Sequence, residues 1–176
     1  RTLIATSLPR AAVGHGVPLI ASDADDFLQA ALTSYALDFV LRQKLGGTNL
    51  TFNYMQQLPI PPPAVVNRES VWASGPIREW IGRRVRHLND GAPLSVRRQL
   101  LAELNAAFFH LYGLMRDDVG YIMESFPIVK RTDIMNFGDY RTMLETVEAY
   151  DAISESAQSG VPYVSRLGQD SGRSVT

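Results

Sequence analysis

An apolar stripe at helical spacing, between residues 27 and 40, constrains the fold of this chain more than any other feature of its sequence. Apolar side chains recur there every three or four positions, as they do on the buried face of an amphipathic helix. They are Phe27, Leu28, Ala31, Leu32, Tyr35, Ala36, Phe39 and Val40. The stripe predicts one long helix that packs against the rest of the protein, with Leu32 and Phe39 buried.

Both ends of this predicted helix carry boundary signals. Ser22-Asp23 supplies an N-cap, and Asp25-Asp26 places negative charge in the first turn, where the helix dipole favours it. Arg42 and Lys44 occupy the last turn, and Gly46-Gly47 follows as a strong stop signal. We therefore expect the helix to end just before the two glycines.

The segments that flank this helix are predicted to be extended. Leu3–Ser7 and Val17–Ala21 are short apolar runs separated by a loop with glycine and proline, a pattern typical of strands. Leu50–Tyr54 is a third candidate strand. Residues 58–63 must be extended, because proline fixes its own torsion and disfavours helix in the residue before it.

The rest of the chain is predicted to be mainly helical. Ser74 and Pro76 begin one helix that ends at residues 89–91, and Ser95 caps the next, which ends at Gly113. Their expected buried residues are Ile77, Trp80, Ile81, Val85, Leu88, Leu100, Leu101, Leu104, Ala107, Phe108 and Leu111. Two more helices are expected over Asp117–Phe126 and Tyr140–Ile153.

These elements predict an α+β, helix-dominated fold, with a small β-containing half packed on a helical half. The predicted divisions are residues 1–66, residues 67–153 and a Ser/Gly-rich tail at 154–176 with one short strand at Val161–Val164. The chain opens on Arg1-Thr2-Leu3-Ile4 without methionine, as in the middle of a strand. We therefore expect a fragment of a larger protein.

Composition excludes several classes of protein. An apolar share of 45% and a charged share of 20% are typical of a globular domain, and no run of eighteen apolar residues could span a membrane. The absence of cysteine excludes disulfides and thiolate metal sites and is compatible with a cytoplasmic location, which we predict. The net charge of −1 conceals a basic segment, since residues 78–98 hold six arginines and two acids.

The motifs of an enzyme are missing from the sequence. No Gly-x-Gly turn follows a strand and no Walker loop is present, so neither a nucleotide nor S-adenosylmethionine has an obvious cradle. Adenine amino methylation uses a Pro-Pro loop with an acid or amide before it and an aromatic after it, whereas Pro61-Pro62-Pro63 is followed by Ala64. His15, His87 and His110 have no neighbouring ligand and are expected to be surface or packing residues. We predict no catalytic site, metal or cofactor in this chain.

Three stretches carry a resemblance to a known family. The first runs from Thr2-Leu3-Ile4-Ala5 through Leu8-Pro9-Arg10 to His15-Gly16, and the second runs from residues 35–40 through 43–50 to 58–62. The third comprises residues 103–114 (ELNAAFFHLYGL), 122–130 (IMESFPIVK) and 137–142 (FGDYRT). Together they resemble the C-terminal region of large N6-adenine DNA methylases, including fused type II and phage-defence restriction–modification enzymes of bacteria. The second stretch is also similar in layout to half of a type I specificity subunit.

The resemblance covers about residues 2–152, with two visible departures. Asn105 stands where most relatives have Asp, and Gly120 lies inside a predicted helix where relatives have a better helix former. The family's catalytic and cofactor motifs match nothing in this chain. S-adenosylmethionine would therefore belong to the parent protein, an adenine-specific DNA methyltransferase.

The resemblance implies DNA target recognition and duplex clamping, non-catalytic in this chain itself. The parent would recognise a duplex sequence, flip an adenine out of the stack and methylate its amino group, which requires a clamp on the duplex. The implied partners are double-stranded DNA and the catalytic methyltransferase domain of the same parent chain. The alternative is a helical docking scaffold that joins the methylase to a helicase, nuclease or partner subunit without touching DNA.

The candidate DNA-binding residues are cations and the polar or flexible residues beside them. They are Arg10, His15, Arg42, Lys44, Gly46, Gly47, Thr48, Asn49, Arg83 and Arg86. Cations and exposed turn amides can approach phosphates, and Thr and Asn side chains can reach base edges.

Each candidate group has a structural alternative. The turn at residues 46–49 could be a plain helix C-cap, and Arg10 and His15 could lie in an ordinary loop. Glu79 and Arg83 have the spacing of a helical ion pair, so the arginines near them could belong to a solvated face. Trp72 and Trp80 are expected to pack in the core.

Overall fold

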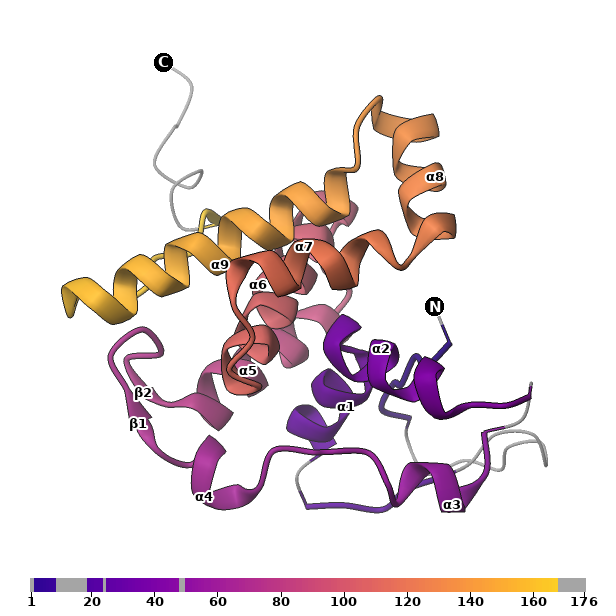
Figure 1. Cartoon of the computed structure of the whole chain (residues 1–176). Helices are drawn as coiled ribbons and strands as arrows, with labels where there is room; N and C mark the ends of the chain where they lie inside the picture. The colour runs from indigo at the N-terminus through magenta and orange to yellow at the C-terminus, as the bar shows by residue number, and fades with distance from the viewer. Residues whose placement is uncertain (1, 9–18, 24, 48–49, 168–176) are drawn as a thin grey trace.

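The computed structural model describes residues 2–8, 19–23, 25–47 and 50–167, which form a helix-dominated fold (Figure 1). Within these ranges there are nine helices and one antiparallel hairpin of two short strands. In chain order they are α1 (Asp25–Thr33), α2 (Tyr35–Lys44), α3 (Phe52–Met55), α4 (Pro63–Val66), β1 (Glu69–Ser70), β2 (Gly75–Pro76), α5 (Ile77–Asn89), α6 (Leu94–Leu111), α7 (Arg116–Glu124), α8 (Pro127–Phe137) and α9 (Arg141–Ser159). None of these described helices has the length and apolar composition needed to cross a membrane.

The core forms where α6 meets α9 and where α1 meets α5 (Figure 1). Phe108 and Phe109 of α6 and Ile153 of α9 are fully buried, and Phe27 of α1 lies in the same cluster, 5.6 Å from the Phe108 ring. The segments on either side of residue 66 therefore share one hydrophobic core. The division of the chain into residues 1–66 and residues 67–153 stays a prediction.

The predicted long helix of residues 23–44 is two helices separated at Ser34. Ser34 has extended backbone torsions (φ −72°, ψ 147°), and its hydroxyl accepts from Leu37 N while donating to Ala31 O. Ser34 is thus the N-cap of α2, a role for which serine is among the preferred residues. The predicted end before Gly46-Gly47 is confirmed, and so is the burial of Leu32, whereas Phe39 is only half-buried.

Asn105 joins α2 to α6. Its Oδ1 accepts from the backbone N–H of Tyr35 at 2.8 Å, and its Nδ2 donates to Leu101 O at 2.7 Å. The side chain is buried, and it satisfies one of the amides that a helix N-terminus leaves without an intrahelical partner. An Asp side chain at this position would also offer an acceptor to Tyr35 N.

The predicted strand at Leu3–Ser7 is wrong. This segment runs along α1 and α2, and side chains satisfy its backbone groups where strand neighbours would otherwise do so. Thr33 Oγ1 bonds both Ala5 N and Ala5 O at 3.2 Å, and the buried Asp38 carboxylate accepts from Thr2 N. An apolar run can therefore be extended without belonging to a sheet.

The other predicted strands also fail where they can be observed. Residues 19–21 are irregular, and Val17 and Pro18 lie outside the described residues. Leu50–Tyr54 is wrong because Thr51 O accepts from Tyr54 N and Met55 N, which closes the short helix α3. Val161–Val164 has no ladder and makes one backbone bond to a neighbour, from Tyr163 N to Trp72 O. The described part of residues 1–66 contains helices and loops, so the β-containing half is not observed there.

The helices predicted after residue 74 are confirmed with small shifts in their ends. Ser74 is not the cap of α5, because it lies at φ 52° in the hairpin turn and Pro76 is the N-cap. Pro93, two residues before Ser95, is the N-cap of α6. The expected buried residues of α5 are buried, while Leu101 and Leu111 of α6 are half-buried.

Two helical segments differ more from the prediction. Helix α8 was not predicted, and α9 continues through Ser159 into the segment that was predicted to be a tail. Gly160, at φ 74°, ends α9 in the left-handed conformation that glycine adopts without strain. Trp72 and Trp80 are buried, as predicted.

Candidate nucleic-acid interface

The carboxyl end of α2 presents two cations beside an open turn. Leu45 N bonds Leu41 O and closes the last turn, and Arg42 and Lys44 are exposed. Gly46 and Gly47 are also exposed, and a side chain added at either would meet no atom within 4 Å. A ligand can therefore approach the backbone closely at this end of the helix.

Arg42 is held in place without being neutralised. Its Nη1 donates to Ser125 O at 2.7 Å, and its guanidinium lies 4.8 Å from the centroid of the Phe126 ring. Both partners are uncharged and lie in the turn between α7 and α8, so the positive charge persists while its position is restricted. Lys44 makes no ion pair with any described carboxylate. Arg10, His15, Thr48 and Asn49 lie outside the described residues.

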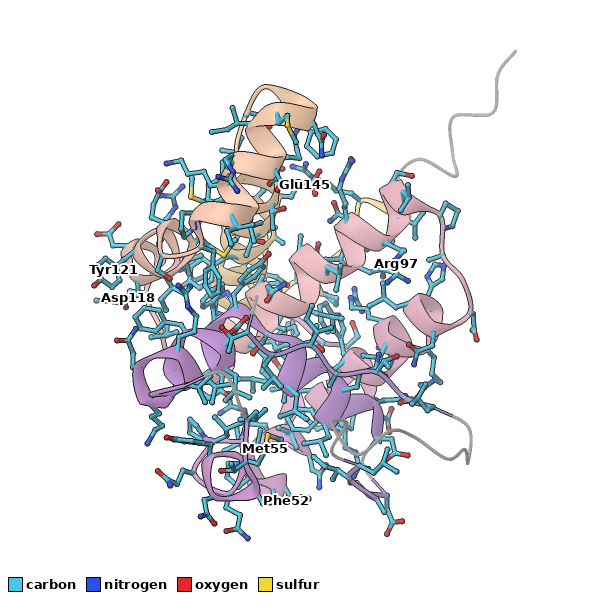
Figure 2. All side chains as sticks on the ribbon, turned by 90° about the vertical axis from the view of Figure 1, so that its right-hand side faces the viewer. Phe52, Met55, Arg97, Asp118, Tyr121 and Glu145 are labelled. Atoms are coloured by element: carbon cyan, nitrogen blue, oxygen red, sulfur yellow. The ribbon has the colours of Figure 1, made fainter. Side chains whose placement is uncertain are left out.

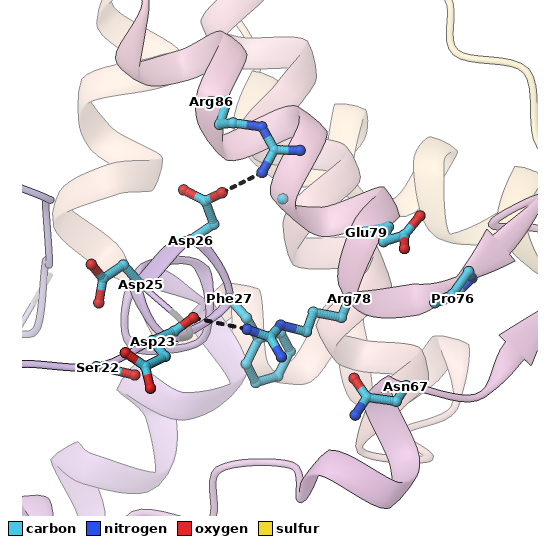
Figure 3. Close-up of a pocket in the computed structure, with 11 residues that line it drawn as sticks. Ser22, Asp23, Asp25, Asp26, Phe27, Asn67, Pro76, Arg78, Glu79 and Arg86 are labelled. Carbon is cyan, nitrogen blue, oxygen red and sulfur yellow. Dashed lines mark hydrogen bonds and ion pairs between the residues drawn. The ribbon is translucent and has the colours of Figure 1, made fainter.

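The arginines of α5 separate into different environments. Arg83 is exposed, and the pair that its spacing with Glu79 suggested is absent from the described ion pairs. Arg86 pairs with Asp26 of α1, with Nη1 2.5 Å from Oδ2 (Figure 3). Arg84 turns inward to Glu103 of α6, with Nε 2.6 Å from Oε2. Of the two predicted contacts on α5, Arg83 has an uncompensated charge and Arg86 is paired.

A cleft of about 790 Å³ lies between α1 and α5 and is unsuited to a phosphate backbone (Figure 3). Its charged lining residues are Asp23, Asp25, Asp26, Arg78, Glu79 and Arg86, which gives four acids and two bases. Both arginines point toward the start of α1, where Arg78 donates to Asp23 O at 3.0 Å and Arg86 meets Asp26. The surplus of negative charge would repel DNA here.

The described lysines and arginines divide evenly between paired and unpaired side chains. The seven that pair with a carboxylate are Arg84, Arg86, Arg98, Arg116, Lys130, Arg141 and Arg166. The seven that do not are Arg42, Lys44, Arg68, Arg78, Arg83, Arg97 and Arg131. The end of α2 thus carries two uncompensated charges within one helical turn, and no described contact links it to Arg83.

Within the described residues no group of three His, Cys, Asp or Glu side chains could hold a metal ion, so neither His87 nor His110 belongs to one. His87 is exposed on α5. His110 stacks on Tyr150 at 4.1 Å, with its Nε2 3.1 Å from Tyr150 O. Burial lowers the pKa of His110 below its ordinary value and outweighs the opposite effects of the Tyr150 carbonyl and Asp151. His15 lies outside the described residues.

Two polar features were not anticipated from the sequence. The carboxylate of Glu103 is fully buried and paired with Arg84, whose pKa is lowered by burial and raised by that carboxylate. Helix α8 leaves large apolar side chains in solvent, including Ile128, Ile134 and Met135. Glu103 could have been suspected, because it lies in an apolar stretch of α6 where an acid needs a partner. Nothing in the sequence of α8 distinguishes exposed from buried apolar residues.

No protein-family model matches this chain, and neither does any curated protein or solved structure.

Proposed function

We propose that this chain contributes DNA target recognition and duplex clamping to a bacterial adenine-specific DNA methyltransferase of a restriction–modification or phage-defence system. The observation that carries the proposal is the pair of uncompensated cations, Arg42 and Lys44, beside the open Gly46-Gly47 turn. The resemblance of residues 2–152 to the C-terminal region of such enzymes supplies the biological context. In this proposal the chain is non-catalytic, and S-adenosylmethionine binds in the catalytic domain of the parent.

The physical basis is contact with phosphate. Lysine and arginine displace counterions from the duplex, which provides affinity that depends on salt and not on sequence. Arg42 suits this role because Ser125 O and the Phe126 ring fix its position while its charge remains available. Such contacts set the register of the protein on DNA, whereas base-edge contacts determine the sequence. Thr48 and Asn49, which follow in the chain, stay the predicted base-contacting residues.

The test is a titration of duplex DNA at several salt concentrations with this chain and with the double variant Arg42→Ala, Lys44→Ala. We expect the variant to bind every duplex more weakly and the slope of log affinity against log salt to fall by about one for each phosphate that the protein no longer neutralises. Arg116→Ala is the matched control, because Arg116 is exposed but paired with Asp151. Equal slopes for the wild type and the double variant would rule out this use of α2.

Helix α8 favours a second candidate function, the docking scaffold. Ile128, Ile134 and Met135 are 64%, 46% and 77% exposed, and large exposed apolar groups that cluster on one helix are typical of interaction surfaces. Figure 1 shows α8 at the edge of the helices, beyond the start of α9, and Figure 2 views the molecule from that side. Such a scaffold would join the methylase of the parent to a helicase, nuclease or partner subunit, and this face of α8 would contact the catalytic methyltransferase domain.

The two candidate functions are separable by experiment. Ile128→Ser with Met135→Ser should weaken binding to the separately produced catalytic domain and leave the salt dependence of DNA binding unchanged. Arg42→Ala with Lys44→Ala should lower the salt dependence of DNA binding and leave the affinity for the catalytic domain unchanged. A double variant on α8 that binds the catalytic domain with wild-type affinity would exclude docking through this face.

A further inference from the structure

The residues that follow α9 fold back over the helices and make an unusual set of contacts. Gly160 ends α9 with a left-handed turn, and Val161–Leu167, here named the strap, returns along the bundle (Figure 1). The strap contains no strand. Tyr163 and Leu167 pack against the hydrophobic core, whereas Val161 and Val164 are 59% and 63% exposed, so the strap has no continuous apolar face and depends on a few specific groups.

The centre of this attachment is the buried carboxylate of Glu103. Its Oε1 accepts from the Tyr163 hydroxyl at 3.1 Å and from Ser165 Oγ at 2.5 Å. From the helices, the Glu103 carboxylate accepts hydrogen bonds from Arg84 Nε at 2.6 Å and from Gln99 Nε2 at 3.1 Å. Four donors thus converge on one carboxylate, and the strap supplies two of them as hydroxyls two residues apart.

An aromatic wall lies beside the carboxylate. The Tyr163 ring meets Trp80 edge-on at 6.0 Å, and Trp80 in turn meets Trp72 at 5.1 Å. The Arg84 guanidinium covers the Trp80 ring at 3.2 Å. Tyr163 N donates to Trp72 O at 3.2 Å, so backbone, ring and hydroxyl of Tyr163 are all recognised.

The helices remain satisfied without the strap. If the strap left, Glu103 would keep the Arg84 and Gln99 bonds, and the buried charge would stay paired. Removing one partner of a buried ion pair is strongly destabilising, whereas loss of the strap would leave both Arg84 and Glu103 in place. The groove also disfavours an anion, because Arg84 is already neutralised and a further negative group would meet Glu103.

We infer that the groove formed by Trp72, Trp80, Arg84 and Glu103 is a binding site for an extended peptide with tyrosine and serine hydroxyls two residues apart, and that the strap is its detachable resident occupant. This inference is independent of the proposed role in DNA recognition. The groove selects an aromatic side chain with a neutral hydroxyl and a second hydroxyl donor. When the strap dissociates, α1–α9 stay folded and the groove is open to the same segment supplied separately.

The test compares strap opening in the full chain and in the double variant Tyr163→Phe, Ser165→Ala. Trypsin cleavage after the exposed Arg166, identified by mass spectrometry, measures opening because proteolysis follows the population of the open form. Loss of two hydrogen bonds should raise the cleavage rate by roughly tenfold or more. Both tryptophans of the chain line the groove, so their emission should shift to the red in the same variant.

The control is Glu148→Ala, which removes the exposed ion pair with Arg166 but keeps the trypsin site, and should change the rate by less than about twofold. A synthetic peptide of residues 161–167 should restore the emission of the double variant, whereas the same peptide with Phe and Ala at the two hydroxyl positions should not. Unchanged cleavage and emission in the double variant would overturn the inference. So would loss of helical circular dichroism in that variant or in Ser165→Ala alone, because the strap would then be an integral part of the fold.

Discussion

Helices α8 and α9 follow one another in the chain and pack in different ways. Along α9, Thr146, Ala149 and Ile153 are buried against α6 and α7, which makes this helix part of the core. Along α8, Asp133 is the buried residue, while Ile128 and Met135 face solvent. The buried apolar residues of α9 therefore contribute to stability, and the exposed apolar residues of α8 are available for contact with another molecule. Equal hydrophobicity does not imply an equal role.

The largest expected effect is at Ile153 of α9. This side chain is fully buried, so Ile153→Ala removes most of its packing and leaves a cavity. We expect the free energy of unfolding to fall by about 2 to 5 kcal/mol, measured by urea denaturation. A loss well below 1 kcal/mol would mean that α9 does not pack on α6 as described.

The next effect tests what holds α8 to α9. Asp133 Oδ2 accepts from Thr142 N at 2.6 Å, so a residue of α8 satisfies a backbone amide in the first turn of α9. Asp133→Ala should cost about 0.5 to 2 kcal/mol, as for loss of a helix cap. Asp133→Asn retains an acceptor and should cost less. Equal losses in the two variants, again by urea denaturation, would show that the hydrogen bond is not the cause.

Tyr140, at the junction of α8 and α9, predicts that the stability of the fold decreases at high pH. The Tyr140 hydroxyl donates to Met123 O at 2.8 Å, and burial, followed by nearby Tyr35 and carboxylates, raises the pKa of Tyr140 above its ordinary value of 10.0. Because the folded state holds the neutral phenol, stability is fully present below pH 10 and is lost as the pH rises above it. In thermal unfolding scans, Tyr140→Phe should lose less stability than the wild type as the pH rises above 10. The same pH profile in both proteins would contradict this prediction.

The smallest effect on stability is expected on the exposed face of α8. Ile128→Ser and Met135→Ser should each change the free energy of unfolding by less than about 0.5 kcal/mol, as is usual for surface substitutions. Chemical denaturation of the two variants beside Ile153→Ala measures the comparison directly. A cost above 2 kcal/mol at either site would show that α8 packs more tightly than its exposure indicates.

The sequence predicted those helices whose apolar residues form a stripe. The residues of α5 from Ile77 to Leu88 and the centre of α6 around Phe108 were identified because burial imposes a spacing of three to four. Helix α8 was missed because its apolar residues are not gathered on its buried side, so the spacing carries no signal. The strand predicted at Leu3–Ser7 failed for a different reason, since an apolar run does not reveal whether its neighbour is a strand or a helix.

The candidate site was predictable in part for the same reasons. Exposure of Arg42 and Lys44 follows from their place after the apolar stripe and before two glycines. The pairing of Arg86 with Asp26 joins residues far apart in the sequence, and no local pattern contains that information. The Glu103 groove needs three distant segments to meet, so its residues become recognisable as a site only in the folded chain.

The bond from Asn105 to the first amide of α2 has a mechanical consequence. Ser34 separates α2 from α1, so the direction of α2 is set at its start by an amide side chain of α6. With ten residues α2 is about 15 Å long, and a tilt of about 10° at Asn105 would displace Lys44 by about 2.5 Å. A small rotation of α2 about this bond inside the protein would therefore reach the cations at its carboxyl end as a displacement comparable to the length of a hydrogen bond.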